Sequence, residues 1–289
     1  MLDAIIKEIK SIKKEVKEIY DKKLYGIGVP QAGMCSHGSS SRISAPSVEE
    51  ETVIGFDQEA EMIKERLLDN NVRKQLEVIS IVGMPGLGKT TLARKVYNDL
   101  LIVYHFYIRG WTYVSHAPVK RDLLLSILNS IVGHMDEMYT LSDEKLGEEL
   151  YKRLSGKRYL IVMDDIWHIQ AWIDLKNYFP NNNNGSRIIF TSRITDRALY
   201  AKPDSSSHFL RFLTEDESWD LLRIKVFGKE SYPPDFVEIG KQIAVKCQGL
   251  PLAIVVIAGL LAKTDQTQDW WKQVAESHSL KTMKSQCGS

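Results

Sequence analysis

Short apolar runs alternate with helical repeats through the middle of the chain. Residues 159–163 are a continuous apolar run, residues 78–82 are a short, mainly apolar segment, and residues 186–192 form another. Runs of this length predict strands that are buried on both faces. Between and after these runs, apolar residues recur at helical spacing. Such an alternation predicts the α/β class, with a parallel sheet covered by helices on both faces.

The other predicted elements extend this pattern. The segment H-F-Y-I-R-G-W-T-Y-V (105–114) predicts a further strand, and a helix is expected to follow Phe56. Ser142 is suited to cap a helix. Beyond about residue 205 the strand pattern fades and helical spacing takes over. Further helices are predicted at residues 118–133, 142–154, 171–178, 214–227, 235–248, 250–263 and 269–275.

The first residues show a heptad pattern. Apolar side chains from Leu2 to Ile19 recur at spacings of three and four residues, which predicts an amphipathic helix over residues 2–23. Its remaining faces are rich in lysine, as a solvated surface would be. Two alternatives stay open for the apolar seam: it rests on the surface of a partner, or it associates with a second copy. Any membrane contact is expected to be peripheral.

Changes in composition divide the chain into segments. Glycine and serine are enriched after the first helix, which is typical of a flexible linker. We therefore expect an N-terminal amphipathic helix at 1–24, a linker at 25–50, an α/β domain at 51–205, a smaller helical domain at 206–277 and an unstructured tail at 278–289.

Composition and charge narrow the class of protein. The chain has 289 residues, of which 44% are hydrophobic and 26% charged, and its net charge is +1. These values are typical of a soluble globular protein and give no long-range attraction to nucleic acid or membrane. The three cysteines are far apart, fit no zinc-site spacing and favour a reducing compartment. With no signal peptide visible, we expect a cytoplasmic protein without a nucleic-acid partner.

The stretch at residues 76–92 carries the strongest chemical signal. It reads L-E-V-I-S-I-V-G-M-P-G-L-G-K-T-T-L and fits the phosphate-binding P-loop, G-x-x-x-x-G-K-[ST]. Glycines let backbone N–H groups converge on phosphate, and the helix that follows adds its unpaired N–H groups. The alternative is an ordinary glycine-rich turn between a strand and a helix. The candidate nucleotide-binding residues are Gly83, Met84, Gly86, Leu87, Gly88, Lys89, Thr90 and Thr91.

Two carboxylates follow the buried strand at 159–163. We expect Asp164 to hold Mg²⁺ together with the Thr90 hydroxyl, while Asp165 orients or deprotonates an attacking water. Adjacent residues of a strand point to opposite faces, so one aspartate cannot perform both tasks. The alternative is a polar strand terminus. Lys89 is expected to reach the β- and γ-phosphates.

A single arginine ends the next predicted strand. Arg193 is placed to contact a γ-phosphate and so to distinguish ATP from ADP. An arginine at a strand end is common, so its position beside the P-loop and the aspartate pair supports this role. Arg187, on the same strand, is interpreted as structural. The histidines show no metal-site spacing.

Taken in order, these residues resemble a known family. The motifs that carry the resemblance are G-M-P-G-L-G-K-T-T (83–91), F-Y-I-R-G-W-T-Y-V-S (106–115), L-I-V-M-D-D-I-W (160–167), G-S-R-I-I-F-T-S-R (185–193), F-L-R-F-L-T-E-D-E-S-W (209–219) and C-Q-G-L-P-L-A (247–253). They are similar to the NB-ARC nucleotide switch of plant intracellular immune receptors, the NLR or NBS-LRR disease-resistance proteins, over about residues 48–277. Trp167 after the aspartate pair resembles the coiled-coil class, and the overall character is similar to nightshade-family late-blight-resistance proteins.

The resemblance implies a P-loop domain followed by a small helical ARC subdomain, with ADP bound at rest and ATP in the active state. It implies a switch in defence signalling that is at most a slow ATPase, with Pro251 packed against the adenine. Two alternatives are an ATPase with real turnover and a fragment that associates with a full-length receptor through its N-terminal helix. By the same resemblance, the base is contacted from the other side by Val53, Ile54, Gly55 and Phe56.

The chain departs from the family pattern in several places. Gly110 stands where alanine is usual, and Ser192 replaces the usual threonine before Arg193. The N-terminal region is reduced to one predicted helix, and the winged helix, the M-H-D motif and the leucine-rich repeats are missing. We therefore expect a truncated receptor, a fragment prepared from one, or a partial gene model, which leaves recognition of a pathogen molecule outside its expected tasks.

Overall fold

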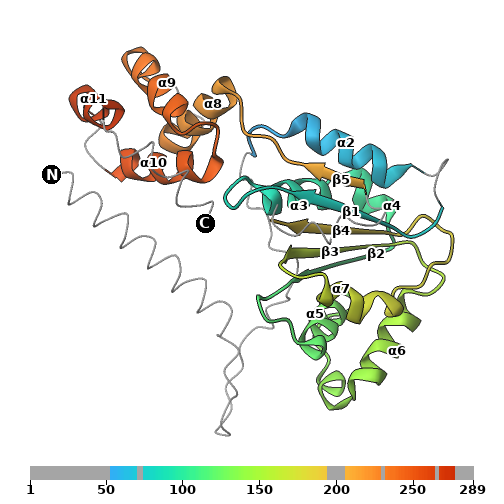
Figure 1. Ribbon diagram of the computed structural model, residues 1–289. Coiled ribbons are helices and arrows are strands. Elements are labelled where there is room, and N and C mark those ends of the chain that lie inside the picture. The colour runs from blue at the N-terminus through green and yellow to red at the C-terminus, as the bar shows by residue number, and fades with distance from the viewer. Residues whose placement is uncertain (1–52, 70–73, 194–205, 229–231, 264–266, 277–289) are drawn as a thin grey trace, which may run out of the picture. The chain divides into compact units, whose positions relative to one another are not determined.

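The structure is a computed structural model that describes residues 53–69, 74–193, 206–228, 232–263 and 267–276 (Figure 1). These residues belong to one compact unit, which spans Arg42–Ser289. The predicted N-terminal helix, the linker and the C-terminal tail lie outside the described residues. No described helix is long and apolar enough to cross a membrane.

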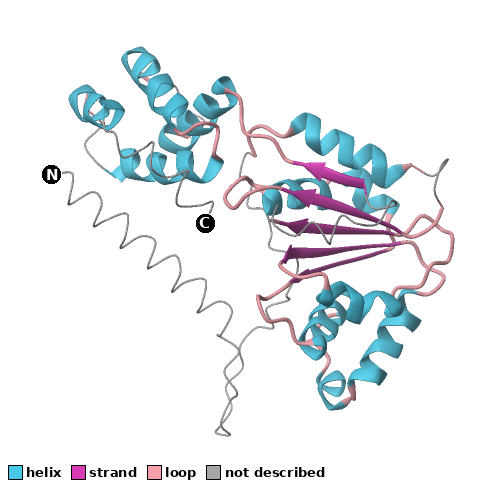
Figure 2. Cartoon of the chain, in the orientation of Figure 1, coloured by secondary structure: helices cyan, strands magenta, loops and turns pink. Residues whose placement is uncertain are grey.

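A parallel sheet of five strands forms the centre of the α/β part, as the apolar runs predicted. The strand order is β2-β3-β4-β1-β5, so the strand before the P-loop lies inside the sheet between β4 and β5 (Figure 2). Because all pairs are parallel, the carboxyl ends of the strands meet at one edge. The strands are β1 (Glu77–Val82), β2 (Ile108–Tyr113), β3 (Tyr159–Ile166), β4 (Arg187–Ser192) and β5 (Ser206–Phe209).

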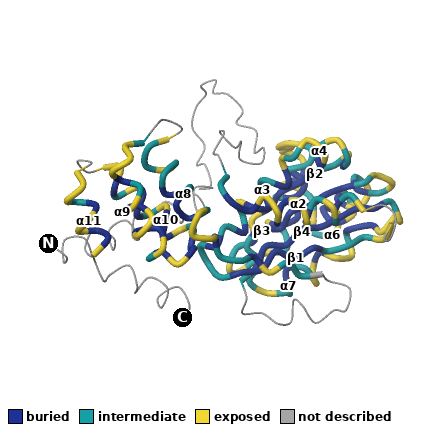
Figure 3. Tube along the Cα trace, turned by 90° about the horizontal axis from the view of Figure 1, so that it is seen from above, coloured by how far each residue is buried: buried dark blue, intermediate teal, exposed yellow. Residues whose placement is uncertain are grey.

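Helices cover both faces of this sheet (Figure 1). Along β3, Leu160 and Val162 join one apolar cluster, whereas Ile161 and Met163 join the other. This alternation explains why the run is apolar throughout, and the strands are buried accordingly (Figure 3). One face carries α2 (Asp57–Leu68), α3 (Lys89–Tyr97) and α4 (Leu100–His105), and the other α5 (Lys120–Val132), α6 (Asp143–Leu154) and α7 (Gln170–Leu175).

The C-terminal part is helical, and its helices begin and end close to the predicted positions. Its core includes Trp271, which is fully buried, and Trp219, whose ring would lie 2.1 Å from a Cβ at Gly240. A residue larger than glycine at that point would displace the ring. Apolar residues of these helices belong to the same cluster as those of α2 and α3. The helices are α8 (Glu215–Phe227), α9 (Val237–Lys246), α10 (Pro251–Lys263) and α11 (Gln268–Glu276).

Two elements differ from the prediction. His105 ends α4 instead of beginning a strand, and β2 starts only at Ile108. Helix α4 is short, is capped by Asp99, and buries Ile102 while Leu100 and Tyr104 stay exposed, so its apolar residues do not all face the core. The strand β5 continues the sheet beyond residue 205. It is an edge strand of four residues, and one neighbour suffices to hold it.

Candidate functional site

The P-loop connects β1 to α3 through glycines that no other residue could replace without strain. Gly86 and Gly88 have φ angles of 79° and 97°, in the region that favours glycine. A Cβ at Gly88 would lie 2.9 Å from the Phe56 ring, and one at Gly86 would lie 2.8 Å from Cβ of Leu252. The loop therefore presents bare backbone, followed by the first N–H groups of α3, which lack partners within the helix.

Lys89 is the first residue of α3 and lies folded over this loop. Its ammonium donates a hydrogen bond to the Met84 carbonyl, at 3.1 Å, and the residue is only 8% exposed. Burial lowers the pKa of Lys89 from its ordinary value, and nearby Asp165 opposes that shift. A buried cation whose one described acceptor is a neutral carbonyl is poorly compensated. The site is therefore suited to receive an anion.

Asp164 is tied to the P-loop helix by a hydroxyl. The Thr90 Oγ1 donates to the Asp164 carboxylate at 2.9 Å, and Thr191 on β4 donates to the same oxygen. Asp164 is 1% exposed. Burial raises its pKa, and the hydrogen bonds from Thr191 and Thr90 oppose that shift. The threonine hydroxyl and the carboxylate lie together as ligands of a hard divalent cation would.

The side chain of Asp165 has a different neighbour from that of Asp164. The ladder between β3 and β4 is irregular between Met163 and Ile166, and Asp165 there has a φ angle of 60°. Its backbone N–H donates to the Thr191 hydroxyl at 2.8 Å, and its carboxylate lies 3.7 Å from Nε of Arg193. The pair is thus divided between two environments. Both aspartates lie within β3 rather than after it, because the strand continues to Ile166.

The other predicted residues fall into two groups. Phe56 is buried against Gly88, while Val53 and Ile54 are half-buried beside it. The first turn of α10, which begins at Pro251, reaches the P-loop: the Leu252 N–H donates to the Gly86 carbonyl at 3.2 Å. Segments distant in sequence therefore converge on the loop.

Three P-loop side chains take other positions. The Leu87 side chain is buried in the core beneath Gly83, so only its backbone faces the loop. Thr91 is exposed on α3, and within the described residues it forms no hydrogen bond with either aspartate. Met84 contributes its carbonyl to Lys89 and is half-buried. Among the P-loop side chains, those of Lys89 and Thr90 are therefore the ones that contact other groups of this site.

Sequence reasoning missed Thr191 and the contacts of Trp167. Thr191 is fully buried and bridges the two aspartates, since its hydroxyl donates to Asp164 and accepts from the Asp165 N–H. The alternation along β4 carries the signal: Ile189 faces the P-loop helix, so Thr191, two residues later, does too. The Trp167 ring lies against Arg193.

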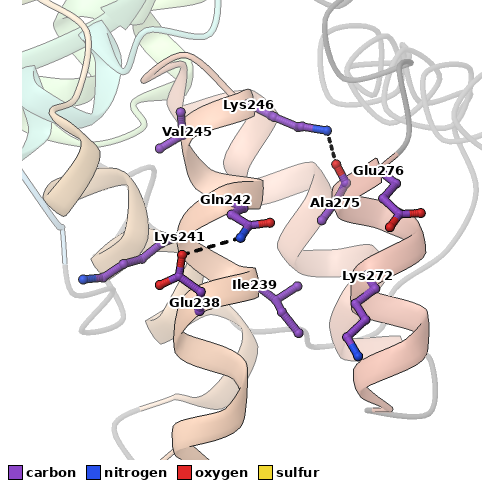
Figure 4. A pocket seen from close by; sticks show the side chains of 9 residues that line it. All are labelled: Glu238, Ile239, Lys241, Gln242, Val245, Lys246, Lys272, Ala275 and Glu276. Carbon is purple, nitrogen blue, oxygen red and sulfur yellow. Dashed lines mark hydrogen bonds between the residues drawn. The ribbon is translucent and has the colours of Figure 1, made fainter.

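A separate hollow of about 480 Å³ lies between α9 and α11 (Figure 4). Ile239, Val245 and Ala275 line it among charged side chains, and the Lys246 ammonium donates to the Ala275 carbonyl. No predicted site residue lines this hollow. It is distinct from the convergence of P-loop, aspartates and Arg193.

Comparison with known proteins decides the family. The family model of the NB-ARC domain matches residues 56–232, more than half of the chain. The chain belongs to the NB-ARC family. The matched range of this NB-ARC chain includes the P-loop, both aspartates and Arg193, which are the residues that the fold brings together. The resemblance read from the motifs is thereby confirmed.

Curated relatives of this NB-ARC chain are plant disease-resistance proteins. A late blight resistance protein homolog of Solanum demissum is 40% identical over 273 residues, covering 94% of this chain and 20% of the relative. The disease resistance protein RPP13 of Arabidopsis thaliana is 39% identical over 288 residues, covering 95% of this chain and 34% of RPP13. The chain thus spans about a fifth to a third of the length of these relatives.

Solved structures confirm the fold of the NB-ARC chain. The Aeropyrum pernix ORC2 protein, solved as ADPNP-ADP complexes, aligns with a TM-score of 0.56 at 16% identity, covering 83% of this chain and 74% of that one. Drosophila ORC bound to DNA aligns with a TM-score of 0.55 at 14% identity, covering 93% and 75%. At these sequence identities the structural similarity shows a shared α/β fold and carries no conclusion about binding partners.

Proposed function

We propose that this NB-ARC chain is the ADP- and ATP-binding switch module of a plant intracellular immune receptor acting in the cytoplasm. The observation that carries the proposal is Lys89, a buried ammonium over a glycine cradle whose one described hydrogen-bond acceptor is a carbonyl. Phosphate oxygens would give this ammonium charged hydrogen-bond acceptors in addition to the carbonyl, and the N-terminus of α3 favours the same anion. The membership of the family and its disease-resistance relatives support the defence role.

The residues divide the work by position. Lys89 binds the β- and γ-phosphates, while Thr90 and Asp164 would hold Mg²⁺, whose chemistry is to neutralise phosphate charge. Their hydrogen bond of 2.9 Å keeps both oxygens in place beforehand. Asp165, whose carboxylate lies beside Arg193, would orient the attacking water. Arg193 contacts the γ-phosphate through its N–H groups.

The adenine would bind where the first turn of α10 approaches the P-loop. The Leu252 N–H to Gly86 carbonyl bond brings Pro251 close to the loop. Phe56 packs against Gly88, and Val53 and Ile54 precede it. We propose that Pro251 contacts the base on one side and residues 53–56 on the other. A P-loop ATPase with real turnover is the second candidate, because the Asp165 carboxylate lies near both Lys89 and Arg193, the two cations that would contact the γ-phosphate.

Identifying the nucleotide that co-purifies with the protein tests this function. Purified chain is denatured, and the released nucleotides are separated and quantified by ion-pair chromatography. We expect ADP at close to one equivalent for a switch held in its resting state. A chain that releases no nucleotide and binds none on addition contradicts the proposal. Steady-state phosphate release then separates a slow switch from an ATPase with turnover.

A further inference from the structure

The indole of Trp167 carries one group on each face. The Arg193 Cζ lies 3.6 Å from the ring centroid, and the His116 ring centroid lies 3.2 Å from it. Two groups this close to one centroid cannot occupy the same face without overlapping. The indole is therefore enclosed between the guanidinium of Arg193 and the imidazole of His116, in the manner of a cation–π contact backed by a second ring.

Strand register places these residues together. Ile166 of β3 pairs with Ser192 of β4, so Trp167 and Arg193 are the next residues of two neighbouring parallel strands. His116 follows β2, whose last residue, Tyr113, pairs with Asp164. The three side chains thus leave adjacent strands at the carboxyl edge of the sheet. The stack is a direct consequence of the sheet that holds the aspartate pair.

Stacking on the indole leaves the N–H groups at the edge of the Arg193 guanidinium available. A guanidinium that rests on an aromatic ring by its flat face keeps its N–H groups in plane, where they bind oxyanions. Among the described residues none accepts a hydrogen bond from this guanidinium, and its nearest carboxylate oxygen, on Asp165, lies 3.7 Å from Nε. Its side chain is 36% exposed. The guanidinium of Arg193 is therefore oriented by the indole, and its N–H groups are available to bind a ligand.

Arg193 needs such a support because it shares the site with another cation. Its charge is one of the influences that lower the pKa of the Lys89 ammonium, after burial. In a site without phosphate, like charges that converge in this way repel each other, and a long flexible side chain would turn toward solvent. The Trp167 face and the Asp165 carboxylate oppose that movement.

We infer that Trp167 is a positioning residue that holds Arg193 ready for the γ-phosphate and so sets the preference of the site for ATP over ADP. The inference rests on the proposed function. His116 backs the indole from its other face. ADP lacks the phosphate that Arg193 addresses, so the contribution of Trp167 falls on ATP alone.

The test compares Trp167→Leu with Trp167→Phe in the full chain. Dissociation constants for ADP and for a nonhydrolysable ATP analogue are measured with Mg²⁺ by calorimetry. We expect Trp167→Leu to weaken binding of the ATP analogue about fivefold, the size of a partly exposed cation–π contact, and to leave ADP within twofold. Trp167→Phe, which keeps an aromatic face, should retain most of the affinity for the ATP analogue.

A second background separates positioning from a merely structural role. In Arg193→Ala the ATP preference is already reduced, and adding Trp167→Leu should then change neither dissociation constant. Equal weakening of both nucleotides by Trp167→Leu, or an unchanged effect on the Arg193→Ala background, would overturn the inference. A wild-type chain that binds neither nucleotide would instead overturn the proposed function itself.

Discussion

The Thr90 hydroxyl donates a hydrogen bond to the carboxylate of Asp164 at 2.9 Å, which joins the first turn of α3 to the end of β3. These residues are far apart in sequence, and the parallel sheet brings them together. Thr191 completes the arrangement from β4 by donating to the same carboxylate. These two hydrogen bonds therefore join the P-loop helix to the ends of β3 and β4.

Replacing Asp164 and replacing Asp165 should have different effects on binding and hydrolysis. Asp164→Asn removes the charge that would face Mg²⁺, so nucleotide binding should lose most of its dependence on Mg²⁺. Asp165→Asn should keep nucleotide affinity within about twofold and lower any phosphate release at least tenfold, because the residue contacts Arg193 rather than Thr90. Asparagine also tolerates the φ of 60° at position 165.

Calorimetric titrations with and without Mg²⁺, together with phosphate-release assays, measure both effects. Each variant serves as the control for the other, since both replace a carboxylate by its amide at neighbouring positions. If they changed Mg²⁺ dependence and hydrolysis by the same factor, the assignment of different roles would be wrong.

A glycine comparison tests the close packing of the P-loop. Gly88→Ala places a Cβ 2.9 Å from the Phe56 ring at a φ of 97°. Gly156 has a φ of 74° with nothing within 4 Å of a Cβ, so Gly156→Ala isolates the conformational cost. We expect Gly156→Ala to lower the free energy of unfolding by about 1–2 kcal/mol, and Gly88→Ala to lower it further and to abolish ADP binding.

Urea denaturation and ADP titration of both alanine variants provide the comparison. Loss of ADP binding in Gly156→Ala would show that a general loss of stability, rather than a blocked loop, accounts for the result.

Glu217 should make the free energy of unfolding depend on pH in the acidic range. It accepts two hydrogen bonds from Arg211 and caps α8 through the Thr214 N–H, and Arg211 also pairs with Glu59 of α2. The Arg211 guanidinium lowers the pKa of Glu217 from 4.5 to about 2. A carboxylate with a lowered folded-state pKa stabilises the protein fully above pH 4.5, and that stabilisation is lost as the pH falls toward 2.

Replacing Glu217 by glutamine measures this contribution. At pH 6 we expect Glu217→Gln to lower the free energy of unfolding by about 1.5–3 kcal/mol, the scale of hydrogen bonds to charged groups. The difference from wild type should shrink between pH 4.5 and pH 3. Glu148→Gln, at an exposed position on α6, is the control and should change stability little at either pH. A difference that grows as the pH falls would contradict the assignment.

The parts of the fold that sequence reasoning predicted are those with local signals. A stretch of a few residues is enough to predict the buried strand β3, the glycine loop before Lys89 and the helix cap at Ser142. The Ser142 side chain accepts a hydrogen bond from the Lys145 N–H, as a capping residue does. The helices α8–α11 also show their spacing locally. Burial on both faces and helix capping are properties of short stretches, which is why these predictions hold.

The parts that were missed depend on contacts across the sheet. Nothing within β5 identifies it as a strand, because an edge strand of four residues draws its hydrogen bonds from β1. Alternation along β4 places Thr191 on the face of the P-loop helix but does not identify Asp164 as its partner. The stacking of Trp167 on Arg193 likewise depends on the pairing of Ile166 with Ser192. The register between two strands depends on the packing of the whole sheet, so the sequence of either strand alone does not predict it.

The most direct test of the central claim is ADP-dependent stabilisation of the chain with and without Lys89. At 100 times its dissociation constant, ADP with Mg²⁺ should stabilise the wild type by about 2.7 kcal/mol in thermal denaturation. Lys152→Ala, which removes an exposed lysine from α6, should show the same stabilisation. Lys89→Ala should lose most of it. No ADP-dependent shift in the wild type, or an equal shift in Lys89→Ala, would contradict the account.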